Sequence, residues 1–178
     1  MNVLFVENDD SFSFNVVSLL PEGARIVRAA EVTSLVGVSA VVIGPGPTDP
    51  QRAGLVGLVR RVVESSVPLL GLCLGHQAIG LAFGASLLRS TPAHGKVAQM
   101  HVGPSRFLPA GHHQVMRYHS LSLANVVAPL RAIAHLEDGT VMAVEHESAR
   151  VLGLQFHPDS YATPGGVRFV QAFFEGLT

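Results

Sequence analysis

Short apolar runs separated by polar and turn residues recur along the first part of the chain. Residues 3–6, 26–27, 40–43 and 69–72 are such runs, bounded mainly by glycine, proline and polar residues. They lack the polar alternation of a strand with one face in water, so the pattern predicts strands that are buried on both faces. Because such strands occur in sheets covered by helices, the sequence predicts an α/β fold with a mostly parallel central sheet.

Amphipathic stretches between these runs indicate the covering helices. Apolar residues keep helical spacing over residues 12–20, and again over residues 55–62 after the turn at residues 44–47. A last helix is predicted to open with Thr163-Pro164, a good cap and first-turn pair, and to present apolar residues on one face as far as Leu177.

The second part of the chain is predicted to add shorter strands that extend or flank the sheet. Residues 104–113 are predicted to form a long loop, and the chain contains no internal repeat or linker. Residues 1–178 are therefore expected to form a single domain. The β-like pieces lie around residues 97–102, 114–118, 133–136, 141–145 and 151–155.

Composition and charge exclude several classes of protein. The chain has 178 residues, of which 48% are apolar and 14% charged, and its mean hydropathy of +0.38 argues against disorder. The net charge of -1 and the absence of any basic cluster longer than Arg60-Arg61 argue against nucleic acid as a partner. No apolar run is long enough for a membrane span, and no signal peptide is expected. A single cysteine, Cys73, cannot form an internal disulfide, so a reducing, cytoplasmic setting is expected.

Cys73 lies between a predicted buried strand and a predicted helix, with Gly71 and Gly75 two positions away on each side. This pattern is typical of a nucleophile elbow, in which a sharp turn pushes the nucleophile into a cleft and the glycines allow close chain approach. The helix N-terminus favours a thiolate, and the N–H of Leu74 can help to hold an oxyanion. A buried structural cysteine is the alternative interpretation.

A thiolate nucleophile in acyl transfer needs a general base and acid, usually oriented by a carboxylate. His157 follows a predicted buried strand, Pro158 fixes the local backbone, and Asp159 is near enough to orient one ring nitrogen. A His-Pro-Asp turn taken alone is more often structural, and the chain has nine histidines. His112 and His113 have no further ligand at a recognisable metal spacing, so no metal site is expected.

Six blocks, in the expected order over essentially the whole chain, resemble the class I, triad-type glutamine amidotransferases. Within that family the resemblance is greatest to the glutaminase subunit of the chorismate-using synthases, anthranilate synthase and aminodeoxychorismate synthase. The blocks are Glu7-Asn8-Asp9-Asp10-Ser11-Phe12 with Asn15, Gly44-Pro45-Gly46-Pro47, Gly71-Leu72-Cys73-Leu74-Gly75-His76-Gln77-Ala78, His94-Gly95-Lys96, Arg117-Tyr118-His119-Ser120-Leu121 and Gln155-Phe156-His157-Pro158.

The resemblance implies a three-layer, flavodoxin-like fold with a smaller antiparallel extension, and hydrolysis of glutamine to glutamate and ammonia. It implies a γ-glutamyl thioester on the cysteine, no cofactor in this chain, Mg²⁺ only on the synthase partner, and delivery of the ammonia to that partner. The implied residue roles are Cys73 as nucleophile, His157 as base and acid, Asp159 as orienting carboxylate, Gly46 and Leu74 as oxyanion-hole donors, and Gln77, Ser120 and Leu121 as substrate-binding residues.

The family carries a glutamate where this chain has Asp159, whose carboxylate reaches less far by one methylene, roughly 1.5 Å. We expect activity to be retained, with a greater dependence on the partner.

Other functions remain open at the level of sequence. The ammonia could serve an anthranilate synthase, which is the leading interpretation, an aminodeoxychorismate synthase, or both. Two further alternatives are a freestanding γ-glutamyl cysteine hydrolase and a catalytically weak regulatory subunit. An α/β-hydrolase shares the elbow but orders its triad as nucleophile, acid and histidine, whereas Asp159 follows His157 here.

Overall fold

A computed structural model describes residues 1–177, so Thr178, the last residue of the predicted domain, lies outside the described residues. Within this range nine strands form one sheet in the order β2-β1-β3-β4-β9-β8-β7-β5-β6. The strands are β1 (Val3–Val6), β2 (Arg25–Val27), β3 (Ala40–Ile43), β4 (Leu69–Leu72), β5 (Ser86–Val102), β6 (Gly111–Ala124), β7 (Leu130–Leu136), β8 (Val141–His146) and β9 (Val151–Leu154).

The sheet has a parallel part and an antiparallel part that meet at β9. Strands β2, β1, β3, β4 and β9 pair in parallel, whereas β8, β7, β5 and β6 continue the sheet in antiparallel order. Every residue of β1, β3 and β4 is buried, which confirms the prediction of central strands covered on both faces. Strand β9, predicted to extend or flank the sheet, lies in its middle beside β4 and is also buried. The prediction is wrong for Arg25–Val27, which is largely exposed because β2 is an edge strand paired only with β1.

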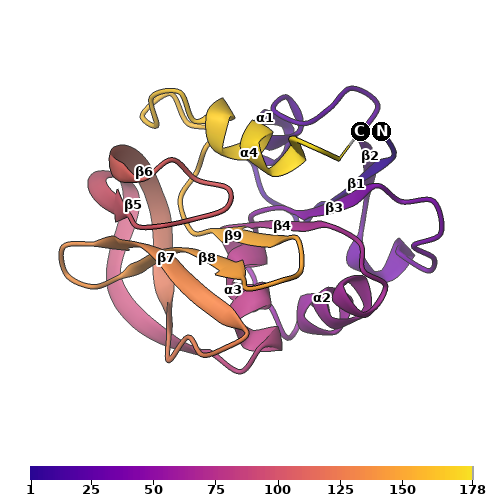
Figure 1. Ribbon diagram of the computed structural model, residues 1–178, viewed down its shortest axis with the longest axis horizontal. Coiled ribbons are helices and arrows are strands. Elements are labelled where there is room, and N and C mark those ends of the chain that lie inside the picture. Colours follow the sequence, from indigo (N-terminus) through magenta and orange to yellow (C-terminus); the bar gives the residue numbers. More distant parts are fainter. Residues whose placement is uncertain (178) are drawn as a thin grey trace.

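Helices cover both faces of the sheet and complete the predicted three layers (Figure 1). One apolar core lies between the sheet and the helices α1 (Ser13–Val17) and α4 (Val167–Phe174). A second core lies on the opposite face, under α2 (Leu55–Glu64) and α3 (Leu74–Ala82). A short 3-10 helix, η1 (Ala29–Glu31), follows β2.

Several element boundaries differ from those predicted from the sequence. The helix predicted over residues 12–20 is regular only from Ser13 to Val17. The last helix begins at Val167 rather than at Thr163, because the Thr163 side chain is committed to hydrogen bonds with β6 and with His157. Residues 86–96, for which no strand was predicted, belong to the long strand β5, whose largely exposed side chains lack a clear hydrophobic period.

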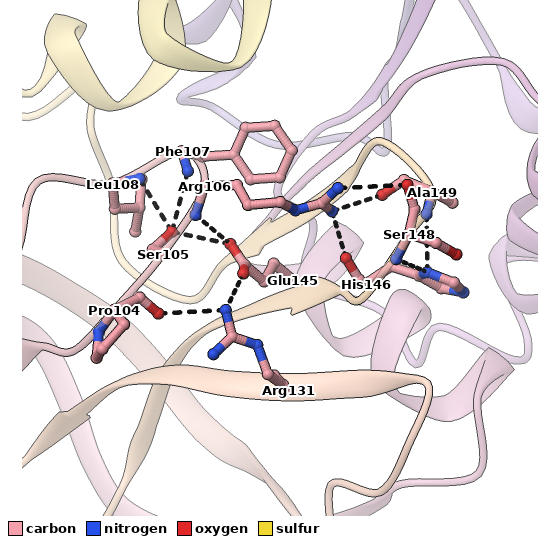
Figure 2. Close-up of polar contacts among 10 residues, drawn as sticks. All are labelled: Pro104, Ser105, Arg106, Phe107, Leu108, Arg131, Glu145, His146, Ser148 and Ala149. Atoms are coloured by element: carbon pink, nitrogen blue, oxygen red, sulfur yellow. Dashed lines mark hydrogen bonds and ion pairs between the residues drawn. The ribbon is translucent and has the colours of Figure 1, made fainter.

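The loop between β5 and β6 is shorter than the predicted 104–113, because β6 begins at Gly111, and it is fastened to β8 (Figure 2). Glu145 of β8 is completely buried, and its Oε2 accepts hydrogen bonds from the Ser105 hydroxyl at 2.8 Å and the Arg106 backbone N–H at 3.1 Å. Its Oε1 pairs with Arg131 of β7. The buried carboxylate is thereby satisfied, and the antiparallel part is held as a unit.

Candidate active site

Cys73 occupies the sharp turn between β4 and α3. Its backbone has φ +49° and ψ -97°, a conformation that costs a non-glycine residue about 1–3 kcal/mol. The flanking glycines are required by packing, since a Cβ at Gly75 would lie 2.3 Å from the Ile43 carbonyl oxygen, and one at Gly71 would lie 2.5 Å from the Gly75 backbone. The predicted strand, turn and helix around the cysteine are therefore confirmed.

His157 reaches Cys73 because β9 lies beside β4 in the sheet. Leu72 pairs with Leu154, and the Cys73 N–H donates to the Leu154 carbonyl at 2.8 Å, so the two chain segments leave the sheet together. His157 is 3% exposed. The register of two parallel strands, rather than any local motif, therefore brings the two residues into one site.

Asp159 lies beside the imidazole, with its Oδ1 3.2 Å from Nδ1 of His157. Burial lowers the pKa of His157, but hydrogen bonds to Asp159 and Cys73 and the charges of those groups outweigh it, and the pKa rises to about 10. An imidazolium is thus favoured at neutral pH. The aspartate side chain is therefore long enough to reach the imidazole.

The segment that carries His157 is hydrogen-bonded to β6. The His157 N–H donates to the Met116 carbonyl at 3.0 Å, and the Met116 N–H donates to the Thr163 hydroxyl at 2.9 Å. That hydroxyl in turn donates to the His157 carbonyl at 2.8 Å. The closed set of three hydrogen bonds fixes the backbone from which the imidazole projects.

Gly46 and Leu74, the two expected oxyanion-hole residues, lie side by side. A Cβ at Gly46 would lie 2.6 Å from the Leu74 side chain, so the β3–α2 loop passes directly over the start of α3. Within residues 1–177 neither backbone N–H donates to a backbone or side-chain acceptor. Two free donors beside a nucleophile are the arrangement that stabilises a tetrahedral oxyanion.

Cys73, His157 and Gly46 line a cavity of about 280 Å³, and all three expected substrate-binding residues, Gln77, Ser120 and Leu121, line it as well. Its size suits a small polar molecule. Leu74 is not one of the residues that line the cavity. The lining residues are Asp10, Gly46, Pro47, Thr48, Cys73, Gln77, His94, Tyr118, His119, Ser120, Leu121 and His157.

Aromatic side chains form one wall around the imidazole. Phe12 packs edge-on against His157 at 5.3 Å between ring centroids, and against Tyr118 at 5.6 Å. His94 stacks on Tyr118 at 5.0 Å. All three residues lie in the blocks that resemble the family, but no role in the site was predicted for them.

Gln155 also belongs to the site and was missed. Its side chain is completely buried, and its Nε2 lies 3.7 Å from the Cys73 sulfur. Its Oε1 accepts a hydrogen bond from Nε2 of Gln77 at 3.3 Å. The signal that could have found it is a glutamine directly after an apolar strand and two positions before His157, because buried polar residues at strand ends often serve a site.

Two further histidines near the site are neutral. Burial, followed by the charge of Arg117, lowers the pKa of His119 to about 4, and its ring bridges the Arg117 side chain and the Leu121 carbonyl. Burial lowers the pKa of His76 to about 3, and neither of its ring nitrogens has a hydrogen-bond partner within residues 1–177. Of these histidines, only His157 is placed to exchange protons with Cys73.

A cysteine on a strand-to-helix elbow, an adjacent imidazole held by a carboxylate and two free backbone donors are the groups that cysteine-dependent acyl transfer requires. In the described part of the chain no three His, Cys, Asp or Glu side chains are grouped to hold a metal ion. No helix among the described residues has the length and apolar character that crossing a membrane requires.

Comparisons with known proteins agree with this class of site. The family model "Glutamine amidotransferase class-I" matches residues 4–177. The chain is 37% identical to anthranilate synthase component 2 of Azospirillum brasilense, covering 96% of this chain and 94% of that protein. It is 40% identical to the protein of the same name from Thermus thermophilus, over 98% and 92% of the two chains.

A longer relative and a solved structure complete the comparison. The chain is 38% identical to part of the aminodeoxychorismate synthase of Streptomyces pristinaespiralis, covering 97% of this chain and 26% of that protein. The crystal structure of a protein from Thermoplasma acidophilum, described as one component of a GMP synthase, superposes with a TM-score of 0.87 at 22% identity, over 99% and 93% of the chains, and shares the fold. The chain belongs to the class I glutamine amidotransferase family.

Proposed function

We propose that this chain is the glutaminase subunit of a chorismate-using synthase, with anthranilate synthase as the leading candidate. The observation that carries the proposal is the cavity that Cys73 and His157 line together with Gln77 and residues of β6, with Asp159 bonded to His157. Full-length matches to proteins named anthranilate synthase component 2 support the choice of partner. The match to part of an aminodeoxychorismate synthase supports that enzyme as the alternative partner.

The first half of the proposed reaction forms a thioester. The Cys73 thiolate attacks the side-chain carbonyl carbon of glutamine, and the negative charge that develops on the carbonyl oxygen is held by the N–H groups of Gly46 and Leu74. The His157 imidazolium gives its proton to the amide nitrogen, the carbon–nitrogen bond breaks, and ammonia leaves. Gln77, Ser120 and Leu121 hold the α-amino and α-carboxylate groups of the substrate.

The second half regenerates the cysteine. His157, now neutral, takes a proton from water as the water oxygen attacks the thioester carbonyl carbon. The carbon–sulfur bond breaks, glutamate is released, and the thiolate and imidazolium are restored. Ammonia that escaped into bulk water would be protonated and lost as a nucleophile, so a partner seated over the cavity and conducting the ammonia to chorismate is part of the proposal.

The test is glutamine-dependent product formation from chorismate by this chain co-purified with its native synthase. Wild type is compared with Cys73→Ser and His157→Ala, and His112→Ala serves as a control because His112 is exposed on β6. We expect the two site variants to lose glutamine-dependent product and to keep ammonium-dependent product, with His112→Ala unaffected. Chromatography of the product distinguishes anthranilate from aminodeoxychorismate.

Glutamine-dependent product that survives Cys73→Ser would overturn the proposal. So would a chain that co-purifies with no synthase and hydrolyses no glutamine. The second result would favour a freestanding hydrolase acting on another γ-glutamyl compound, or a regulatory protein without activity.

A further inference from the structure

Gln155 lies next to the nucleophile because of the same strand register that delivers His157. Leu72 and Leu154 are paired at the ends of β4 and β9, so the residues that follow them, Cys73 and Gln155, are neighbours where the strands end. The Gln155 backbone N–H donates to the Met142 carbonyl at 2.9 Å, which fixes the base of the side chain. Its amide is completely buried against the sulfur.

The hydrogen bonds around Gln155 determine which end of its amide faces the sulfur. The Leu121 carbonyl can only accept, so the group of Gln77 that lies 3.3 Å from it must be the NH₂ end. The same NH₂ group lies 3.3 Å from the Gln155 side chain, which must therefore present its oxygen to Gln77. That leaves the NH₂ end of Gln155 for Cys73, at 3.7 Å from the sulfur.

The two polar neighbours of the sulfur favour different protonation states. The Tyr118 carbonyl oxygen, at 3.9 Å from Sγ, can only accept, and it suits a thiol that donates its S–H. The Gln155 N–H can only donate, and it suits a thiolate that accepts. A hydrogen bond to the charged form of a group favours that form, especially where burial excludes water.

We propose that Gln155 is a positioning residue whose amide N–H holds the Cys73 sulfur beside His157 and favours the thiolate. The role deepens the proposed function and rests on it only for its catalytic meaning, because the state of the sulfur can be measured without any substrate. The line of hydrogen bonds from Leu121 through Gln77 to Gln155 also joins the wall of the substrate cavity to the nucleophile.

The experiment uses the fact that Cys73 is the only cysteine of the chain. Iodoacetamide adds to a thiolate, so the rate of the single mass increase, followed by mass spectrometry from pH 5 to 10, reports the thiolate at this one position. The variants are Gln155→Met, which keeps the chain length but removes the donor, and Gln155→Glu, which keeps the shape but presents a carboxylate.

We expect Gln155→Met to raise the pH of half-maximal alkylation by about one unit, the size expected for one hydrogen bond to a charged group. Gln155→Glu is expected to shift the midpoint further, because a carboxylate repels the thiolate. The matched control is Gln171→Leu, since Gln171 is exposed on α4, and its profile is expected to follow wild type.

Thermal unfolding identifies a variant that has lost its fold. The pH of half-maximal alkylation is then compared only for the Gln155 variants that remain folded. An unchanged midpoint in a folded Gln155→Met or Gln155→Glu protein would overturn the role. Glutaminase activity of the same samples with the synthase separates the two proposals. If the Gln155 variants shift the alkylation midpoint but the wild-type chain with the synthase has no glutaminase activity, the proposed function is refuted and the role of Gln155 stands.

Discussion

Asp159 reaches the His157 imidazole because the chain folds back after His157. The residues after His157 fold back, with Thr163 bonded to the His157 carbonyl and Gly166 packed so closely that a Cβ there would lie 2.0 Å from the Pro158 carbonyl oxygen. This packing brings Asp159 Oδ1 to His157. The second carboxylate oxygen, Oδ2, is buried without a partner within residues 1–177, which costs about 1–3 kcal/mol. The position of Asp159 beside the imidazole therefore lowers the stability of the folded protein.

Replacing Asp159 with asparagine tests this orientation. The amide keeps the shape of the side chain but carries no charge to stabilise an imidazolium, so we expect Asp159→Asn to lower the rate of glutamine hydrolysis by roughly 10²-fold or more, an order-of-magnitude figure taken from other triads. The measurement is glutamate release by the purified complex. Asp159→Glu, which keeps the charge, is the control and is expected to stay within about tenfold of wild type. Equal rates for the asparagine variant and wild type would contradict the role of the carboxylate.

At the scale of elements, the elbow is a contact between α3 and the neighbouring strand β3. The helix begins so close to the sheet that Gly75 lies against the Ile43 carbonyl, and a larger residue cannot be accommodated without moving the helix N-terminus that carries Cys73. The position of the nucleophile thus depends on a glycine that has no chemistry of its own.

Gly75→Ala is expected to lower the free energy of unfolding by about 2 kcal/mol or more, because its Cβ would meet backbone rather than a flexible side chain. Gly57→Ala, in the first turn of α2 with nothing within 4 Å of the added Cβ, is the matched control. It is expected to raise the free energy of unfolding by about 0.5–1 kcal/mol through helix propensity. Urea denaturation monitored by circular dichroism measures both, and equal effects of the two substitutions would refute the packing argument.

Elements with a strong local pattern could be predicted from the sequence. The buried runs that became β1, β3 and β4 contain only apolar residues and glycine, and the predicted apolar stripe of α2 is buried as expected. The long strand β5 could not be predicted in the same way, because its stability comes from pairing with β6 rather than from its own residues. Gln155 was missed for a similar reason, since its partners Cys73 and Gln77 are distant in sequence.

At the scale of the whole molecule, buried histidines make stability depend on pH in two opposite ways. His157 has a pKa raised to about 10, so its contribution is complete below about pH 6.5, its ordinary value, and is lost as the pH rises towards 10. His76 and His119 have pKa values lowered to about 3 and about 4, so they remain neutral in the fold while the unfolded chain takes up protons below about pH 6.5. The histidine contributions therefore favour the fold most near pH 6.5.

We expect the free energy of unfolding to fall both above and below that pH. Two substitutions are each expected to weaken the pH dependence on one side only. His157→Gln is expected to reduce the loss between pH 6.5 and 9, and His76→Gln the loss between pH 6.5 and 5. Urea denaturation at pH 5, 6.5 and 9 measures the slopes, and His112→Gln, at an exposed position, is the control. Slopes that are identical in wild type and both buried-histidine variants would contradict the assignment.

The pairing of β4 with β9 also has a consequence for synthesis of the protein. The two strands are adjacent in the sheet, but roughly eighty residues separate Leu72 from Val151, a stretch that a ribosome needs on the order of 4–16 s to add. Until β9 emerges, the edge of β4 is unpaired and Cys73 has neither His157 nor Gln155 beside it. An incomplete nascent chain therefore exposes an apolar strand edge to chaperones, and it carries its nucleophile without the histidine needed to hydrolyse glutamine.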